Sequence, residues 1–522
     1  MAQNVYLLLI SEKINKMSEK KELEKLPFEA AIDQAGFGLY SYILTSLTGV
    51  AIISFVCIVY ASTIIIPTSA CELETTVSQQ GLLAAGPVVG SMLGGILWGY
   101  MADTRGRRKM LLVALTGGII FNLIASISVN WVMLMIFQFI ASLFASGLYS
   151  MSMSLLSESV PMAKRNIVVL LVSSIFLLSQ GIMAVLAIPI IPLTFSHDLD
   201  ALGITWNSWR TLLVVYSFPS IITAIWLCFM KESPKFAFVK GEEDRAMDIL
   251  RAIHRVNHLR STEELQVKGL LQETNAQGVA GGSPKDQIVP LFKHPLLKFT
   301  IIMTTLFVFQ QVGAFLVWLP TIADKFVRIL QTGENTDLSM CGVLALESPP
   351  SDNPVPCALN ETSLLMVLGV AAMQSVFNII ISLLLGVTGR RNMVLVVTAL
   401  CGVSGIVVNL VPNAVGSAVF FVVLVMGVVV VGLYTTIIVA LFPTHLRALA
   451  IALPMTFGRI GTFASIQILN VMLANSCEAG FYLFSSLFAA SAIVASFLPD
   501  DRRLPSAAPP ASTSEEADQK NQ

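Results

Sequence analysis

Residues 99–109 read Gly-Tyr-Met-Ala-Asp-Thr-Arg-Gly-Arg-Arg-Lys, and this stretch decides the fold. It lies between two long apolar runs, residues 81–100 and 110–129. A charge-dense turn of this length cannot lie inside hydrocarbon, where every unsatisfied polar group is costly. We therefore expect it to connect two membrane-spanning helices at the surface of a bilayer.

The composition of the whole chain agrees with a membrane protein. Hydrophobic residues make up 55% of the 522 residues and charged residues 12%, whereas a soluble domain carries about 25% charged residues. The net charge of −1 argues against a nucleic-acid partner, which requires a basic face. The seven cysteines show no metal-ligand spacing. Since the sequence also has no phosphate-binding loop and no nucleophile with a partner, we expect no metal, no cofactor and no enzymatic activity.

Twelve segments can cross a bilayer, because a spanning helix needs about 20 apolar residues. They are residues 41–67, 79–100, 110–129, 131–156, 167–193, 209–230, 299–323, 363–386, 393–411, 415–442, 448–473 and 480–498. A long polar loop separates the sixth segment from the seventh. The sequence therefore predicts an all-α membrane protein with two pseudo-symmetric bundles of six transmembrane helices.

The distribution of basic residues predicts the orientation. Lysine and arginine follow spans 2, 4, 6, 8 and 10, whereas the connections after spans 1, 3, 5, 9 and 11 carry none. The connection after span 7 carries only Lys325 and Arg328. Because basic loops stay in the cytoplasm, we expect a multi-pass integral membrane protein with both termini in the cytosol.

The same pattern predicts the domain organisation. A cytosolic N-terminal segment (1–40) precedes the first bundle (41–230), and a cytosolic loop (231–298) follows it. In this loop, residues 241–257 have helical periodicity, with an apolar stripe formed by Ala246, Ile249, Leu250 and Ile253. The second bundle (299–498) contains an outer loop (324–362), and a tail (499–522) is rich in Pro, Ser, Ala and Glu, which is typical of disorder.

The outer loop carries two features of a non-cytosolic surface. Asn360-Glu361-Thr362 is an acceptor sequence for N-glycosylation. Cys341 and Cys357 lie in the same loop, on the oxidising side, where a disulfide can persist. We therefore predict a glycan on Asn360 and a bond between these two cysteines.

The charged residues near residues 99–109 suggest a gate. Asp103 ends span 2 and Glu158 ends span 4, both on the cytosolic side, and Gly106 permits a turn with positive φ. Our hypothesis is that Asp103, Arg107, Glu158 and Arg165 form a cluster that closes this side of the protein; the alternative is that they only anchor helix ends. The gate residues are Asp103, Gly106, Arg107, Arg108, Glu158, Arg165 and Arg447.

The second half repeats this pattern weakly. Arg390 and Arg391 follow span 8, but Gly386 stands at the position that matches Asp103. Arg447 follows span 10, with Ala440 where an acid would be expected. Any gate in the second half must therefore be weaker or built differently.

Polar residues inside the spans are mostly neutral. Because a polar side chain that faces lipid is costly, we expect them to line a central cavity, although hydrogen bonds between helices are an alternative for each one. Two adjacent glutamines favour the cavity, because both cannot point at one neighbour. The candidates are Gln138, Gln180, Gln310, Gln311, Trp318, Gln374, Asn378, Tyr434 and the cation Arg459.

Several motifs resemble a known family. Residues 99–109 are similar to the loop 2–3 signature of the major facilitator superfamily. Trp209-Arg210, Phe218-Pro219-Ser220 and Glu232-Ser233-Pro234-Lys235-Phe236 resemble the synaptic vesicle glycoprotein 2 family and the sugar and organic-ion porters. The resemblance covers about residues 27–498, and Lys231 departs from the porters' leading proline. It implies the major facilitator fold and a transporter of vesicles or of the plasma membrane.

The departures from the family define the expected function. The predicted spans contain no Asp or Glu, and proton-coupled transport uses an intramembrane carboxylate. We therefore expect a monomeric facilitator, surrounded by lipid, that moves a small polar or organic solute without proton coupling. Two alternatives remain: a non-transporting vesicle glycoprotein that binds a ligand or partner, and a plasma-membrane organic-ion porter.

Overall fold

The structure is a computed structural model that describes residues 25–193, 195–200, 203–259, 265, 267, 269–271, 289–332, 338–345, 359–442 and 446–499. Within these residues, twelve helical segments are long and apolar enough to cross a membrane. They are Leu39–Ser69, Val77–Arg105, Arg107–Ala125, Trp131–Ser157, Met162–Ala187, Ser208–Cys228, Leu296–Arg328, Glu361–Thr388, Arg390–Val407, Ala414–Ile438, Ala450–Asn475 and Cys477–Ser496. All twelve predicted spans are confirmed.

The chain divides into two compact units, which we describe separately. Unit 1 comprises Met1–Ser283, Leu319–Val327 and Pro349–Ser375, and unit 2 comprises Pro284–Trp318, Arg328–Ser348 and Val376–Gln522. The division passes through the helices of spans 7 and 8. The domain boundaries expected from the sequence therefore stay a prediction.

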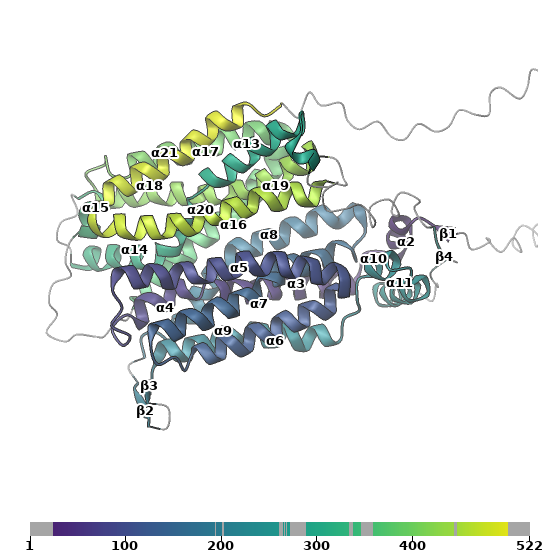
Figure 1. Ribbon diagram of the computed structural model, residues 1–522, viewed down its shortest axis with the longest axis horizontal. Coiled ribbons are helices and arrows are strands. Elements are labelled where there is room, and N and C mark those ends of the chain that lie inside the picture. The colour runs from purple at the N-terminus through teal and green to yellow at the C-terminus, as the bar shows by residue number, and fades with distance from the viewer. Residues whose placement is uncertain are drawn as a thin grey trace, which may run out of the picture. The chain divides into compact units, whose positions relative to one another are not determined.

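Unit 1 contains the first six spans and a small group of helices beyond their ends (Figure 1). Its helices are α2 (Phe28–Ala35), α3 (Leu39–Val59), α4 (Ser62–Ser69), α5 (Val77–Arg105), α6 (Arg107–Ala125), α7 (Trp131–Ser157), α8 (Met162–Ala187), α9 (Ser208–Cys228), α10 (Pro234–Val239) and α11 (Glu243–Asn257). A parallel pair joins β1 (Lys25–Leu26) to β4 (Gly269–Leu270), and an antiparallel pair joins β2 (His197–Leu199) to β3 (Ile204–Trp206).

Small residues allow the helices of unit 1 to pack closely. A Cβ on Gly90 would lie 2.3 Å from the Phe139 carbonyl oxygen of α7, and one on Gly94 would lie 2.1 Å from that of Leu143. The indole of Trp98 donates to the same Leu143 carbonyl at 2.9 Å. In lipid, helices associate through close packing and hydrogen bonds of this kind, because the hydrophobic effect does not favour their association there.

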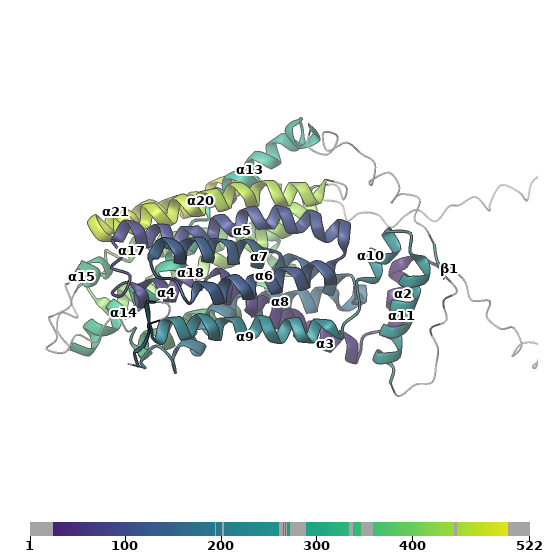
Figure 2. The same cartoon turned by 60° about the horizontal axis from the view of Figure 1, so that its bottom comes forward.

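Three short helices, α2, α10 and α11, lie together beyond the ends of the spans of unit 1, and we call them the platform (Figures 1 and 2). The apolar stripe expected on residues 241–257 is confirmed, since Ala246, Ile249, Leu250 and Ile253 of α11 are buried. Phe28 of α2 stacks on Phe238 of α10, with ring centroids 5.8 Å apart. The predicted helix therefore belongs to a small helical layer that includes part of the N-terminal segment.

Unit 2 contains most of the remaining helices. Its elements are η1 (Val289–Phe292), α13 (Leu296–Phe309), the start of α14 (Gly313–Thr332), α15 (Met340–Ala345), the end of α16 (Glu361–Thr388), α17 (Arg390–Val407), α18 (Ala414–Met426), η2 (Gly427–Val429), α19 (Val430–Leu441), α20 (Arg447–Asn475) and α21 (Cys477–Ser496). Phe315, Phe421, Phe481 and Phe484 form an aromatic cluster in its core, with ring centroids 4.9–6.2 Å apart.

Span 7 differs from the sequence prediction in two ways. It is interrupted between α13 and α14, where Gln310 leaves helical geometry with ψ of 63°. It also continues beyond residue 323 to Thr332, so that Asp324 lies within α14. Asp103, Glu361 and Glu478 likewise lie near the ends of spans as the structure bounds them. The expectation that no acid lies inside any span therefore holds only for the shorter bounds predicted from the sequence.

Candidate functional site

The turn at residues 105–107 is built around Gly106, as the sequence predicted. Its φ is +104°, a conformation that L side chains rarely adopt. A Cβ at this position would lie 2.7 Å from Glu232 Oε2. Glu232 reaches the start of α6, where its Oε1 accepts a hydrogen bond from the Arg108 backbone N–H at 2.8 Å. The turn is thus closed by a carboxylate from the segment after span 6.

Arg107 is the centre of the predicted charge cluster. Its Nη2 lies 3.1 Å from Asp103 Oδ1 and 3.1 Å from Glu158 Oε1. Asp103 is 74% exposed, whereas Glu158 is 15% exposed and also accepts a hydrogen bond from the Ser233 hydroxyl. Since water screens an exposed carboxylate, the pair between Arg107 and Glu158 carries most of the interaction.

Arg165 does not join this cluster, contrary to the prediction. Its Nη2 lies 2.9 Å from Glu29 Oε2 of α2, and the other oxygen of Glu29 lies 3.4 Å from Lys235 Nζ. The prediction did not consider Glu29, which lies in the N-terminal segment more than a hundred positions earlier in the chain. Arg108 also has another role, since its guanidinium donates to the carbonyls of Leu227 and Cys228 at 3.1 and 2.8 Å.

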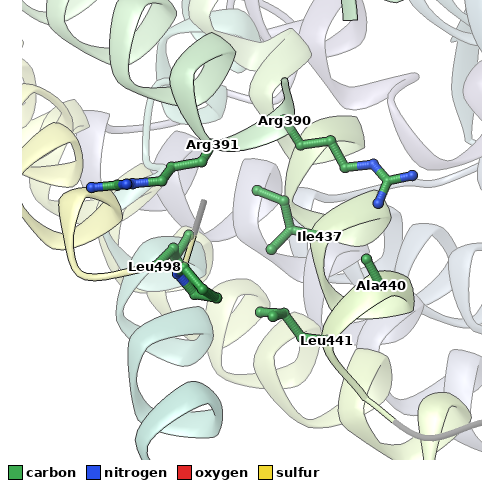
Figure 3. Close-up of a pocket in the computed structure, with 7 residues that line it drawn as sticks. Arg390, Arg391, Ile437, Ala440, Leu441 and Leu498 are labelled. Carbon is green, nitrogen blue, oxygen red and sulfur yellow. The ribbon is translucent and has the colours of Figure 1, made fainter. Parts of the chain in front are cut away.

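The corresponding turn of unit 2 borders a shallow, open recess (Figure 3). It is lined by Arg390, Arg391, Ile437, Ala440, Leu441, Leu498 and Pro499. The two arginine side chains extend in opposite directions, and Arg391 Nη2 donates to the Ser496 carbonyl at 2.6 Å. Arg447 begins α20, and its side chain lies outside the described part of the structure.

The interruption of span 7 exposes hydrogen-bonding groups inside unit 2. Gln310 and Gln311 are 9% and 3% exposed. Gln311 Nε2 donates to the Val308 carbonyl at 2.7 Å. Among the described residues, Gln311 Oε1, Gln310 Nε2 and Trp318 Nε1 have no hydrogen-bond partner. A buried polar atom without a partner is costly, so these groups are suited to a polar ligand.

Two helices support this interruption from within unit 2. A Cβ on Gly461 of α20 would lie 2.7 Å from Gln311 Nε2, and one on Gly458 would lie 3.2 Å from the Phe307 carbonyl oxygen. Tyr434 of α19 is fully buried, with its ring 5.4 Å from that of Phe307. The missing side chain of Gly461 therefore leaves space for the Gln311 amide, and that of Gly458 lets α20 pack against Phe307.

Gln138 belongs to a different network, within unit 1. Its Nε2 donates to Asn122 Oδ1 at 3.0 Å, and Asn122 Nδ2 donates to the Leu213 carbonyl and the Ser217 hydroxyl at 2.9 and 3.0 Å. These bonds link α7, α6 and α9. Gln138 Nε2 thus makes a hydrogen bond between helices, while its Oε1 has no hydrogen-bond partner among the described residues, so its place in a solute cavity stays a prediction.

The other cavity candidates are placed on three helices. Gln180 lies on α8, Gln374 and Asn378 lie on α16, and Arg459 lies on α20 between Gly458 and Gly461. Gln374 is buried, and the other three are half-buried. Their contribution to a cavity stays a prediction.

The predicted disulfide is wrong. Cys341 of α15 is bonded to Cys477, the first residue of α21, with their Cα atoms 5.6 Å apart. Cys357 lies outside the described residues, and Cys71 is also disulfide-bonded. Nearness in the sequence suggested the pairing, whereas α15 packs against residues far along the chain.

Asn360 caps the start of α16. Its Oδ1 accepts a hydrogen bond from the Thr362 backbone N–H at 3.0 Å, and its own N–H donates to Asp324 Oδ1 at 2.7 Å. Asp324 of α14 thereby holds the beginning of span 8. Glycosylation of Asn360 stays a prediction.

A buried ion pair in unit 1 escaped the sequence analysis. Arg210 is 1% exposed, and its Nη2 lies 2.5 Å from Glu72 Oε1. The arginine also donates to the carbonyls of Ser126 and Ser128, both at 2.9 Å, while Trp209 Nε1 donates to Glu72 at 2.6 Å. The sequence did contain a sign of this ion pair, the motif Trp209-Arg210, but the motif was interpreted only as a resemblance to a family. Its physical role is to tie the ends of α4, α6 and α9 together.

Comparisons with known proteins agree with this architecture. A family model described as the Major Facilitator Superfamily matches residues 47–347. The Caenorhabditis elegans protein svop-1 is 28% identical over 275 residues, which cover 53% of this chain and 49% of that protein. Human synaptic vesicle glycoprotein 2A is 26% identical over 241 residues, which cover 46% of this chain and 32% of that protein. The chain thus spans half or less of these relatives.

A solved structure has the same fold. The xylose transporter XylE from E. coli, in a partially occluded inward-open conformation, superimposes with a TM-score of 0.64 at 15% identity. The alignment covers 89% of this chain and 99% of the transporter. The arrangement of twelve helices expected from the sequence is therefore confirmed.

Proposed function

The chain belongs to the major facilitator superfamily, and on this premise we propose that it is a facilitator that carries a small neutral polar solute by alternating access. Binding occurs at the interruption of span 7, where Gln310 and Gln311 supply amide groups. The observation that carries this proposal is the set of buried hydrogen-bonding atoms without partners at the interruption. A solute with several hydroxyl groups would satisfy donors and acceptors together.

Neutral solutes fit these groups better than ions. The amides and the Trp318 indole carry no net charge, and a buried charge without a partner is far more costly than a buried hydroxyl. The name of XylE, a xylose transporter, agrees with a polyhydroxylated solute. The organic-ion porter alternative would require a counter-charge near Gln311, for which Arg459 is the candidate.

Transport without proton coupling remains part of the proposal. Asp324 is the acid that the structure places within span 7, near its end, where it accepts the Asn360 N–H. A carboxylate that holds a helix start has a structural role already. We infer that Asp324→Asn retains solute uptake and that a pH gradient does not change the rate.

The proposed orientation places the platform and both termini in the cytosol. The bond between Cys341 and Cys477 supports it, because disulfides persist on the non-cytosolic side of membranes. Cys341 follows span 7, whose connection carries only Lys325 and Arg328, and Cys477 follows span 11, whose connection carries no Lys or Arg. Vesicle localisation follows from the names of the relatives, and we propose a monomer with two bundles of six spans.

The test is solute uptake by purified protein in proteoliposomes, with a panel of radiolabelled neutral sugars and polyols. We expect saturable uptake of at least one of them, equal with and without a pH gradient. Gln311→Leu should raise the half-saturation concentration about tenfold, the effect of losing a buried hydrogen bond of roughly 1.4 kcal/mol. Asn122→Leu is the matched control: it removes a buried amide of unit 1 that is hydrogen-bonded at both ends, and it should lower stability without changing that concentration.

The other outcomes identify the alternatives. Ligand-induced thermal stabilisation without flux would favour a vesicle glycoprotein that binds without transporting. Uptake restricted to organic ions would favour the ion porter. Strict dependence on the gradient would contradict uncoupled transport.

A further inference from the structure

Spans 1, 3 and 5 begin without a cap of their own. They start with α3, α6 and α8. The residues before these helices are Gly38, Gly106 and Pro161, and none of them has a side chain that accepts a hydrogen bond from the helix start. The first backbone N–H groups of a helix have no partner within the helix. Side chains from other parts of the chain can satisfy them.

The caps come from the platform and the turn that leads to it. Asn257 Oδ1, at the end of α11, accepts from the Tyr40 N–H of α3 at 3.0 Å. Glu232, just before α10, accepts from Arg108 of α6. Asp33 Oδ1 of α2 accepts from the Met162 N–H of α8 at 3.0 Å. Each of the three helix starts thus has one acceptor supplied by another part of the chain.

We propose that the platform caps spans 1 and 5 from outside while Glu232, in the turn that leads to it, caps span 3, and that Asn257 is the positioning residue through which α11 holds span 1. The consequence for the rate of transport rests on the proposed function. The capping itself does not, and it can be measured in the purified protein without a substrate.

Asn257 uses both ends of its amide. While Oδ1 accepts from Tyr40, Nδ2 donates to the carbonyls of Ala35 and Gly36 at 3.2 and 2.6 Å. The side chain therefore bridges the end of α2 and the start of α3. An aspartate could accept at the helix start, but it could not donate to the two carbonyls.

The loop between α2 and α3 fits closely around the end of α11. A Cβ on Gly38 would lie 2.5 Å from the Asn257 carbonyl oxygen and 2.8 Å from its Cα. Gly36 has φ of +75°, and a Cβ there would lie 2.5 Å from His258 Cε1. These distances leave no room for a side chain, so the contact between loop and helix depends on both glycines.

Hydrogen exchange of the full-length protein, measured by mass spectrometry, tests the capping. In Asn257→Ala, amides 40 and 41 should exchange about five to ten times faster, which is the usual effect of losing a helix cap. Asn257→Asp keeps an acceptor and should lose less protection. Gly38→Ala should expose the same amides by displacing α11. The matched control is Arg251→Ala, since Arg251 lies on the same helix and contacts Asp248 at 3.4 Å.

Uptake by the same variants in proteoliposomes tests whether the capping of span 1 affects the rate of transport. Asn257→Ala should lower the maximal rate several-fold and leave the half-saturation concentration unchanged, because the residue acts on movement of span 1 and not on binding. Unchanged exchange at amides 40 and 41, or an equal change in Arg251→Ala, would overturn the capping. Faster hydrogen exchange with an unaltered rate of uptake would overturn the effect of the capping on transport. If the unmodified protein shows no uptake while exchange responds as expected, the capping stands and the transport proposal fails.

Discussion

The basic turns after spans 2 and 8 share a sequence pattern but differ in their electrostatic surroundings. In unit 1, Arg107 pairs with Glu158 and Asp103. In unit 2, Arg390 and Arg391 line a recess in which Ala440 stands where an acid would be expected. Two halves with similar folds can therefore contribute unequally to the free-energy difference between transport states. Four substitutions, ordered by expected effect, test this comparison.

Glu158→Ala should have the largest effect. It leaves the guanidinium of Arg107 without its less exposed partner and also removes the acceptor of Ser233. Because loss of one member of a partly buried pair costs about 2–3 kcal/mol, thermal melting of the detergent-solubilised protein should occur several degrees lower. Glu242→Ala, which breaks the exposed pair with Arg245, is the control and should leave melting unchanged. Equal melting of the two variants would show that the pair around Arg107 is unimportant.

Arg391→Ala should have an intermediate effect. It removes the hydrogen bond from Arg391 Nη2 to the Ser496 carbonyl, and a charged donor to a carbonyl contributes about 1–1.5 kcal/mol. Melting measured by intrinsic fluorescence should decrease accordingly, and Arg391→Lys should recover part of the loss. A decrease as large as that of Glu158→Ala would contradict the proposed difference between the units.

Ala440→Glu should make unit 2 resemble unit 1. A carboxylate at position 440 would lie on the side of the recess to which Arg390 extends (Figure 3), and it should stabilise the protein by about 0.5–1 kcal/mol. If charge pairing at this end favours one transport state, uptake should also become slower. Ala440→Gln, which adds similar volume without charge, should change neither property. A glutamate variant that behaves like the glutamine variant would refute the electrostatic account.

Asp103→Asn should have the smallest effect, although the sequence suggested a central role. Its carboxylate is 74% exposed, and exposed pairs contribute at most about 0.5 kcal/mol. Both melting and uptake rate should stay close to those of the unmodified protein. A loss comparable to that of Glu158→Ala would indicate that Asp103 becomes buried in another transport state.

The spans could be predicted from the sequence because lipid imposes one strong condition, a run of apolar residues long enough to cross it. The positive φ of Gly106 and the buried stripe of α11 followed from local rules of the same kind. The interruption of span 7 at Gln310 could not be predicted, since apolar residues continue on both sides of it. Its two glutamines were recognised as unusual, but only the structure shows which of their atoms lack partners.

Contacts between distant segments account for the remaining errors. The partner of Arg165 is Glu29, more than a hundred positions earlier, and Cys341 bonds with a residue 136 positions later. The role of Arg210 depends on Glu72 and on carbonyls at the end of α6. Such pairs leave no periodic signal in one sequence, because the bundle topology brings them together and not the local pattern.

The bond between Cys341 and Cys477 also limits the order of events during synthesis. Spans 8 to 11 lie between the two cysteines along the chain. The ribosome must therefore release these four helices, and the insertion machinery must place them in the membrane, before the two sulfur atoms can meet. Until then Cys341 has no access to this partner, and truncated chains that end before span 12 would lack Cys477 altogether.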